Sequence, residues 1–462
     1  MPAGVPGAAD LLKGATRHMK RQSLSVKTAA LLLLFAFCAP AVAGCADASG
    51  PAVTPDAPYT GAYIPVSGPT PVFLTARTFA SDRVAEKAAD DFRLSYADFA
   101  LRLLSSCAAG NEKGENTMVS PLSVMTALAM TANGARGQTR DEMLGLFGAT
   151  DPEELNRQVF NYTSSLASGG GARFSSANSL WVTDSGDFKV CAEFIKTVEN
   201  TYRADVAAID FADAQKAAGE INGWCSDNTG GMIPSVVEPD DLPPDTAMAL
   251  LNALCFDAEW SDKFTSDSLS EGVFHASSGD RTATMMRGKA SYYLSGGGAE
   301  GVVKYYSGGR YAFAAVMPKK GADIRKYVSE LGGKALLGML DGKKKIEVTL
   351  TMPRFSADYS IKLPEVLYSL GMKQAFDPEC ADFSGLGRFD DGSGVYISDV
   401  IHKTHIDVDN DGTKAAAVTA VILPKATSMA EHRTVVLDRP FLYAVIDTEY
   451  SLPVFFGICE GP

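Results

Sequence analysis

The sequence predicts one large α+β domain that follows an N-terminal leader and a linker. Helical spacing of apolar residues marks Ala89–Ser106, where Phe92, Tyr96 and Phe99 share one face. Further along, Phe274–Pro318 alternates apolar and polar residues between glycine-rich turns, as antiparallel strands do. The part of the chain after the linker, about 380 residues, has no second linker and no internal repeat, so we expect a single domain.

The N-terminal segment has the features of a secretory leader. Basic residues precede an apolar run, Ala29 to Ala43, which is short for a membrane span. Small residues followed by Cys45 resemble a bacterial lipobox. The resemblance implies a lipoprotein signal peptide over residues 1–44 and an acylated Cys45 that anchors the protein outside a bacterial cell membrane. The alternative is ordinary cleavage nearby, which would give a soluble secreted protein.

The composition of the linker and the net charge of the chain limit the kinds of partner that this protein is expected to bind. Residues 45–85 are rich in Pro, Ala, Gly, Ser and Thr, which predicts an extended tether before a domain over residues 86–462. The formal net charge is −13, and the predicted leader is itself basic, so the remainder is more acidic still. Such a chain is not expected to bind nucleic acid by neutralising phosphates. An acidic balance suits a soluble extracellular protein.

Cysteine usage gives no sign of zinc or redox chemistry. Beyond the leader and Cys45, six cysteines are scattered singly: Cys107, Cys191, Cys225, Cys255, Cys380 and Cys459. Several lie among apolar residues, so we expect buried small hydrophobes. Disulfides are permitted outside the cell, but the sequence does not pair them.

An unusual stretch runs from Ile406 to Met429. An acidic turn, Asp409–Gly412, leads into the small and β-branched residues Thr413–Leu423, whose alternation suits a central strand. Pro424 and polar residues then bound the segment as they would bound an exposed loop. A loop with the composition of a central strand is either an aggregation hazard or a strand held in reserve.

This stretch resembles the reactive-centre loop of the serpins, a family of serine protease inhibitors, with the loop at about residues 410–430. Other serpin-like motifs follow in family order over Phe92–Gly457. The resemblance implies the serpin fold, in which helices surround a large, mostly antiparallel central sheet and the reactive-centre loop is exposed. The residues that resemble the family hinge are Gly412, Thr413, Lys414, Ala415, Ala416, Ala417, Val418 and Thr419.

The resemblance also implies a shutter and a breach, the regions where the family's main sheet opens. Within the Asn…Ser-Pro-x-Ser pattern, Ser120 is predicted to cap a helix that begins at Pro121. Three departures from the family are Asp257-Ala258 in place of Lys-Gly, Asn410 in place of Glu, and Val418 in place of the common Ala. The residues carried over are Asn116, Ser120, Pro121, Ser123, Asn178, Trp260 and His402.

The implied mechanism is suicide inhibition. A serine protease cleaves the loop, forms an acyl-enzyme, and is trapped when the loop inserts into the main sheet. Family spacing from Gly412 and from Pro440 places the cleaved bond at Ala426–Thr427, which suits elastase-like proteases. The alternatives are Lys425 (trypsin-like) and Met429 (chymotrypsin- or elastase-like). The resemblance implies a monomer that is not an enzyme and needs no cofactor.

Rival interpretations start from other patterns. Asp407, Asp409 and Asp411 imitate a calcium loop, but Val418 stands where a bidentate Glu is required. His402 and His405 give only two metal ligands. Two alternative functions stay open, namely a non-inhibitory serpin-fold binding protein and a calcium-dependent surface adhesion or enzyme domain.

A glycine-rich stretch, Gly296–Gly301, matches the GxGxxG pattern of dinucleotide-binding folds. A strand-like segment follows it where such a site needs a helix, so a hairpin turn is predicted there instead.

Overall fold

The computed structural model describes residues 29–38, 63–65, 72–73, 85–166, 171–413 and 431–462. Helices and sheets form an α+β architecture around one large, mostly antiparallel sheet, as the sequence predicts. Among the described residues, no helix is long and apolar enough to cross a membrane.

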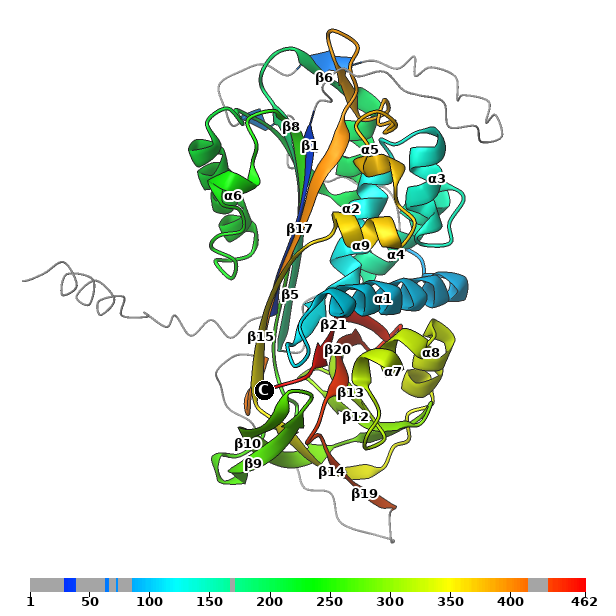
Figure 1. The fold of residues 1–462 in the computed structure, drawn as a ribbon, viewed down its shortest axis with the longest axis vertical. Coiled ribbons are helices and arrows are strands. Elements are labelled where there is room, and N and C mark those ends of the chain that lie inside the picture. The colour runs from blue at the N-terminus through cyan, green and yellow to red at the C-terminus, as the bar shows by residue number, and fades with distance from the viewer. Residues whose placement is uncertain (1–28, 39–62, 66–71, 74–84, 167–170, 414–430) are drawn as a thin grey trace, which may run out of the picture.

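The main sheet has eight strands and forms the long axis of the molecule (Figure 1). Among the described strands of this sheet, only β5 and β7 pair in parallel. β18 (Gly412–Thr413) pairs with the C-terminal end of β8, off the main path. In spatial order the other strands are β15 (Phe355–Lys362), β17 (Tyr396–Val408), β1 (Ala29–Cys38), β8 (Thr246–Glu259), β5 (Ala172–Thr183), β7 (Ala204–Ile209) and β3 (Val72–Phe73).

Three smaller sheets complete the β structure. One is β19 (His432–Val436), β14 (Glu347–Pro353), β10 (Gly279–Ala290) and β9 (Leu269–Ala276). The second is β11 (Tyr292–Gly296), β12 (Ala299–Tyr305), β13 (Tyr311–Pro318), β20 (Phe441–Asp447), β21 (Leu452–Cys459) and β4 (Thr117–Val119). The third is β16 (Gly387–Phe389), β6 (Phe188–Cys191) and β2 (Tyr63–Pro65).

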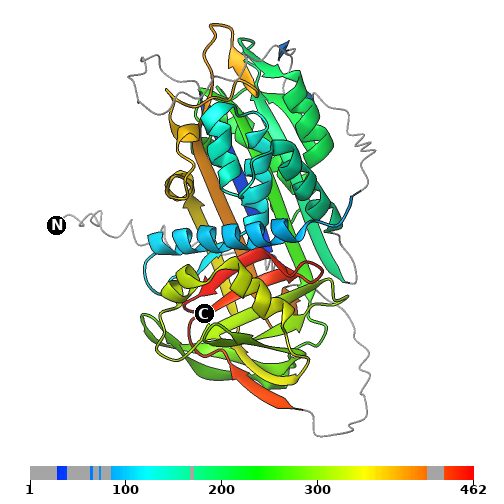
Figure 2. The ribbon, with the colours of Figure 1, turned by 90° about the vertical axis from the view of Figure 1, so that its right-hand side faces the viewer.

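Helices cover both faces of the main sheet. α6 (Ala214–Asn228) packs on one face, and most of the others lie on the opposite face (Figure 1). Figure 2 shows α1 lying across the molecule, between the upper helices and the C-terminal strands below. The remaining helices are α1 (Asp90–Gly110), α2 (Pro121–Ala132), α3 (Gly137–Gly145), α4 (Pro152–Ser165), α5 (Ala192–Tyr202), α7 (Ile324–Glu330), α8 (Gly333–Asp341) and α9 (Pro364–Ser369), with 3-10 turns at Pro239–Asp241, Ser266–Ser268 and Gln374–Phe376.

Several local predictions are confirmed. The helix predicted over Ala89–Ser106 is α1, which continues to Gly110 because its apolar face still packs on the core. Ser120 caps α2 by accepting a hydrogen bond from the Ser123 N–H at 3.3 Å, and Pro121 is the first helical residue. The glycine-rich stretch is the β11–β12 hairpin, whose turn residues Gly297 and Gly298 have φ of 55° and 78°.

The predicted tether joins the domain at two points. Tyr63–Pro65 pairs with β6, and Val72–Phe73 pairs with β7, so these pieces do not behave as an extended tether. Short apolar segments satisfy backbone groups that would otherwise lie at sheet edges. The rest of residues 45–85, including Cys45, lies outside the described residues apart from Ala85.

The apolar part of the predicted leader is placed in the main sheet. Ala29–Cys38 forms β1, which pairs with β17 on one side and β8 on the other. Periodicity alone cannot distinguish an apolar export signal from a buried strand, because both need only a short uncharged run. The signal-peptide interpretation stays a prediction.

Of the six cysteines beyond residue 45, Cys107, Cys225, Cys255 and Cys459 are buried free thiols, Cys191 is also buried, and Cys380 is exposed. Burial raises the pKa of the Cys107 and Cys225 thiols to about 12. These thiols therefore stay protonated at neutral pH and pack as small hydrophobic groups.

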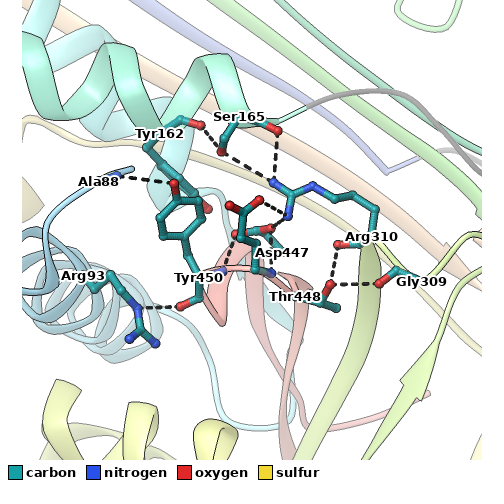
Figure 3. Close-up of polar contacts among 10 residues, drawn as sticks. Ala88, Arg93, Tyr162, Ser165, Gly309, Arg310, Asp447, Thr448 and Tyr450 are labelled. Atoms are coloured by element: carbon teal, nitrogen blue, oxygen red, sulfur yellow. Dashed lines mark hydrogen bonds and ion pairs between the residues drawn. The ribbon is translucent and has the colours of Figure 1, made fainter. Parts of the chain in front are cut away.

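A buried ion pair fixes the turn between β20 and β21 (Figure 3). Asp447 is fully buried against Arg310 and also accepts hydrogen bonds from the backbone N–H groups of Glu449 (3.2 Å) and Tyr450 (3.0 Å). Burial raises the pKa of Asp447 to about 6, although the Arg310 guanidinium opposes the shift. Arg310 also donates to the Ser165 carbonyl at 3.1 Å, so α4 is tied to this C-terminal hairpin.

Candidate functional site

The turn between β17 and β18 leads the chain back onto the main sheet. The Asp409 carboxylate accepts hydrogen bonds from the N–H groups of Asp411 (2.9 Å) and Gly412 (3.2 Å). Gly412 has φ of 149°, and a Cβ there would lie 2.3 Å from the Ala258 carbonyl oxygen. Only glycine allows the backbone at position 412 to lie this close to β8. Gly412 therefore sets the point where the predicted hinge joins the sheet.

Thr413 is the first hinge side chain on the sheet. It is fully buried, lies opposite Ala258 in β8, and its hydroxyl is 3.0 Å from the Tyr306 hydroxyl. The rest of the predicted hinge, Lys414–Thr419, lies outside the described residues. So do the predicted reactive bond, Ala426–Thr427, and its alternatives Lys425 and Met429.

Trp260 lies at the C-terminal end of β8, next to the point where β18 joins the sheet. Its ring stacks on Tyr306 with the centroids 4.5 Å apart, and its indole N–H donates to the Asp409 carbonyl at 2.8 Å. Lys304, which sequence analysis did not single out, lies over the Phe264 ring at 4.5 Å and donates to backbone carbonyls. Burial lowers the pKa of Lys304 to about 8.

A chain of buried polar side chains crosses the middle of the sheet. The Ser123 hydroxyl in α2 hydrogen-bonds the Asn252 side chain in β8, and Asn252 donates to the Asn178 side-chain carbonyl in β5 at 2.7 Å. Asn178 in turn donates to the Tyr202 carbonyl at 2.7 Å. Sequence reasoning missed Asn252, although a lone amide inside the apolar run of β8 is a detectable signal.

His402 lies on β17 beside this chain and is fully buried. Its Nε2 accepts a hydrogen bond from the Ser120 backbone N–H at 3.3 Å, which requires an unprotonated nitrogen. Burial lowers the pKa of His402 to about 3. The imidazole is therefore neutral near pH 7 and joins β17 to the start of α2.

His405 faces the other side of β17. Its imidazole lies 2.6 Å from the Asp358 carboxylate and 3.5 Å from that of Asp407. Hydrogen bonding to Asp407 and then to Asp358 raises its pKa to about 9. Because residues three apart on a strand point to opposite faces, His402 and His405 cannot share a metal ion. Within the described ranges, no group of three or more potential metal-ligating side chains gathers.

Asn116 has different partners from the other predicted shutter residues. Its side chain accepts from the N–H groups of Glu460 (2.8 Å) and Gly461 (3.0 Å), and it donates to the Gly461 carbonyl at 2.7 Å. The sequence groups Asn116 with Ser120 and Ser123, but the structure uses it to hold the C-terminus.

These features are those of the serpins, and comparison with known proteins supports this. The family model of the serpins, described as serine protease inhibitors, matches residues 94–462. The chain belongs to the serpin family. An uncharacterized serpin-like protein of Thermococcus kodakarensis is 32% identical over 361 residues, which cover 77% of this chain and 82% of that protein. Human leukocyte elastase inhibitor is 28% identical, with 79% and 97% covered.

Two solved structures show how far the likeness extends. Tengpin, a thermophilic serpin in its native state, matches with a TM-score of 0.76 at 33% identity, covering 85% of this chain and 100% of tengpin. A complex of thyroxine-binding globulin with thyroxine matches with a TM-score of 0.68 at 25% identity, covering 80% and 99%. The same fold is thus found in a protein named for ligand binding.

The lowered pKa of His402 predicts stability that is lost in acid. An unfolded histidine titrates near pH ~6.5, so the unfolded chain takes up this proton first as the pH falls. The free energy of unfolding should therefore decrease from about pH 6.5 toward pH 3. In denaturant titrations, we expect His402→Gln to flatten the slope between about pH 6.5 and 5.

His405→Gln is the matched control. Its raised pKa gives stability that is present below about pH 6.5 and lost as the pH rises toward 9, so this variant should alter only the alkaline side. An unchanged acid slope in His402→Gln would contradict the role assigned to the buried imidazole.

Proposed function

We propose that this serpin is an extracellular inhibitor that traps serine proteases by inserting its cleaved loop into the main sheet. The target protease attacks the loop and forms an acyl-enzyme. The freed N-terminal part of the loop then continues from β18 along β8, and the protease is carried with it. Insertion is favourable because it converts free backbone groups into ladder hydrogen bonds.

The observation that carries this proposal is the state of the hinge. Gly412 and Thr413 already pair with Glu259 and Ala258, so the first two residues of the inserting strand lie on the sheet. Ala415 and Ala417, which strand alternation would place on the same face as Thr413 after insertion, are small and uncharged. Small inward side chains allow a new strand to enter a close-packed sheet without cavities or buried charge.

Elastase-like proteases are the proposed targets. Ala426 is the residue that the S1 pocket would receive, and a small side chain suits a small pocket. The human relative named leukocyte elastase inhibitor is consistent with this class. Membrane anchoring through a lipid on Cys45 would place the inhibitor at the cell surface, where proteases from outside arrive.

A non-inhibitory role is the second candidate. It is favoured by the match to thyroxine-binding globulin, whose name and bound thyroxine indicate ligand binding by this fold. A binding protein would be cleaved in the loop without retaining the protease.

The decisive experiment incubates the protein lacking residues 1–45 with pancreatic elastase, neutrophil elastase, trypsin and chymotrypsin. We expect a denaturant-resistant complex with an elastase and a released fragment that begins at Thr427. The measurements are gel electrophoresis and N-terminal sequencing of that fragment. Cleavage without a complex would support the binding-protein candidate, and a fragment beginning at Ala426 or Ala430 would move the reactive bond to Lys425 or Met429.

A charge at the hinge should turn the inhibitor into a substrate. Thr413→Arg places a cation at a fully buried position, where an unpaired charge costs several kcal/mol. We expect the protease to cleave this variant at the normal bond and then leave without forming a complex. Lys414→Glu is the matched control, because alternation directs residue 414 to the opposite face. Full trapping by Thr413→Arg would exclude loop insertion as the mechanism.

Lipid anchoring is tested at Cys45. Export of the complete chain in a bacterial host should place the protein in the membrane fraction, with an acylated N-terminal peptide detectable by mass spectrometry. Cys45→Ser removes the thiol that lipid is attached to, so we expect the protein to move to the soluble fraction. Ala46→Ser is the control and should stay with the membrane. A soluble wild-type protein with an unmodified N-terminus would favour ordinary secretion.

A further inference from the structure

The strand position that insertion requires is occupied by the chain's own N-terminal segment. β1 lies between β8 and β17 and is antiparallel to both, as Figure 1 shows. Leu33, at its middle, lies opposite Asn252 in β8 and His402 in β17. β1 therefore passes between Asn252 and His402 at the centre of the sheet.

β1 provides partners for two strand edges at once. Each residue of a strand directs its N–H and C=O groups to one neighbour or the other, so a strand inside a sheet satisfies both edges that it faces. The Ser398 hydroxyl also donates to the Ala36 carbonyl at 3.1 Å, and Ala36 is 1% exposed. The ten residues contain no charge, proline or glycine, a composition that suits a fully buried strand.

β1 and the hinge use the same edge of β8. Thr413 lies opposite Ala258, and Ala29 lies opposite Phe256, two residues further down the strand. Continued in the register of β18, the loop would place Ala415 opposite Phe256, the partner that Ala29 already has. A β8 residue has one position for a neighbour on this edge, so the two segments exclude each other.

We propose that Ala29–Cys38 is an internal occupant of the insertion site, and that a chain which retains it is a protease substrate rather than a trap. Removal of the segment frees the strand position between β8 and β17, so the cleaved loop can insert there and trap the protease. The cleavage predicted before Cys45 would do this, so that export and activation would be one event. This inference rests on the proposed inhibitory function.

β1 competes well against the loop because its backbone is already hydrogen-bonded to both β8 and β17. After cleavage, the loop must displace β1 before it can pair with the β8 residues that precede Ala258, while the acyl-enzyme is free to hydrolyse. Slower insertion at unchanged hydrolysis favours release of the active protease. The outcome for a given chain therefore depends on whether β1 holds its place.

The test compares four purified chains: the full chain made by cell-free synthesis, the full chain with Leu33→Pro, the full chain with Leu12→Pro, and residues 46–462. Intact mass confirms that each full chain is uncleaved. Proline at position 33 removes a ladder N–H in the middle of β1 without shortening the chain. Leu12→Pro is the matched control because it makes the same change outside β1.

We expect residues 46–462 and the Leu33→Pro chain to trap elastase at similar stoichiometry. The full chain and the Leu12→Pro chain should give about tenfold less complex and be cleaved instead. Equal trapping by the full chain and by residues 46–462 would overturn the proposal.

Hydrogen exchange separates this inference from the proposed function. In the full chain, amides of Ala30–Phe37 should exchange slowly, and β8 and β17 should be more protected than in residues 46–462. If no chain traps any protease but this protection is present, the proposed inhibitory function is wrong, while the placement of Ala29–Cys38 between β8 and β17 is supported. Fast exchange throughout Ala30–Phe37 would refute the occupant whatever the protease assay shows.

Discussion

The structure depends on how the backbone groups between β8 and β17 are satisfied. Both strands are buried, and a buried N–H or C=O without a partner costs about as much as a lost hydrogen bond. A neighbour is therefore needed along most of their length. β1 supplies it along β8 from Thr246 to Phe256, and Gly412 and Thr413 of β18 supply it at the C-terminal end of β8. The site is thus a position that accepts one β-strand. It recognises that strand mainly through backbone hydrogen bonds and less through side-chain contacts.

Side chains from neighbouring elements surround the strand position between β8 and β17. Trp260 and Tyr306 pack together at the C-terminal end of β8, where Thr413 lies. Below them, Asn252 and Asn178 join adjacent strands through buried hydrogen bonds. Buried polar contacts of this kind hold strands in one register, because a shift would leave amides unpaired. A sheet that accepts a new strand needs such hydrogen bonds to keep its other strands in register. The neutral imidazole of His402 provides a further hydrogen bond, between β17 and the start of α2.

The two segments that suit the position have similar compositions for one physical reason. A strand buried on both faces tolerates no charge, and close packing favours small or branched apolar residues. Ala29–Cys38 meets this requirement throughout, and the stretch after Thr413 meets it from Ala415 to Leu423, beyond the single charge of Lys414. An apolar run that suits export also suits the centre of a sheet, so one sequence feature can serve in both roles.

The sequence by itself determined the elements whose signals are local. Helix α1, the Ser120–Pro121 start of α2, the Gly297–Gly298 turn and the glycine at position 412 depend on neighbouring residues, and each is found where expected. The ordered motifs also established the family. Helical periodicity, capping and positive φ act over a few residues, so a linear pattern is enough to reveal them.

Only the tertiary structure decided the partners that lie far apart in the chain. Asn252 became the centre of a polar chain, Asn116 was directed to the C-terminal residues, and Arg310 was paired with Asp447. The placement of Ala29–Cys38 belongs to this group. Its composition indicates a need for an apolar environment, but whether a membrane or a gap between two strands meets that need depends on which unpaired edges the folded domain offers.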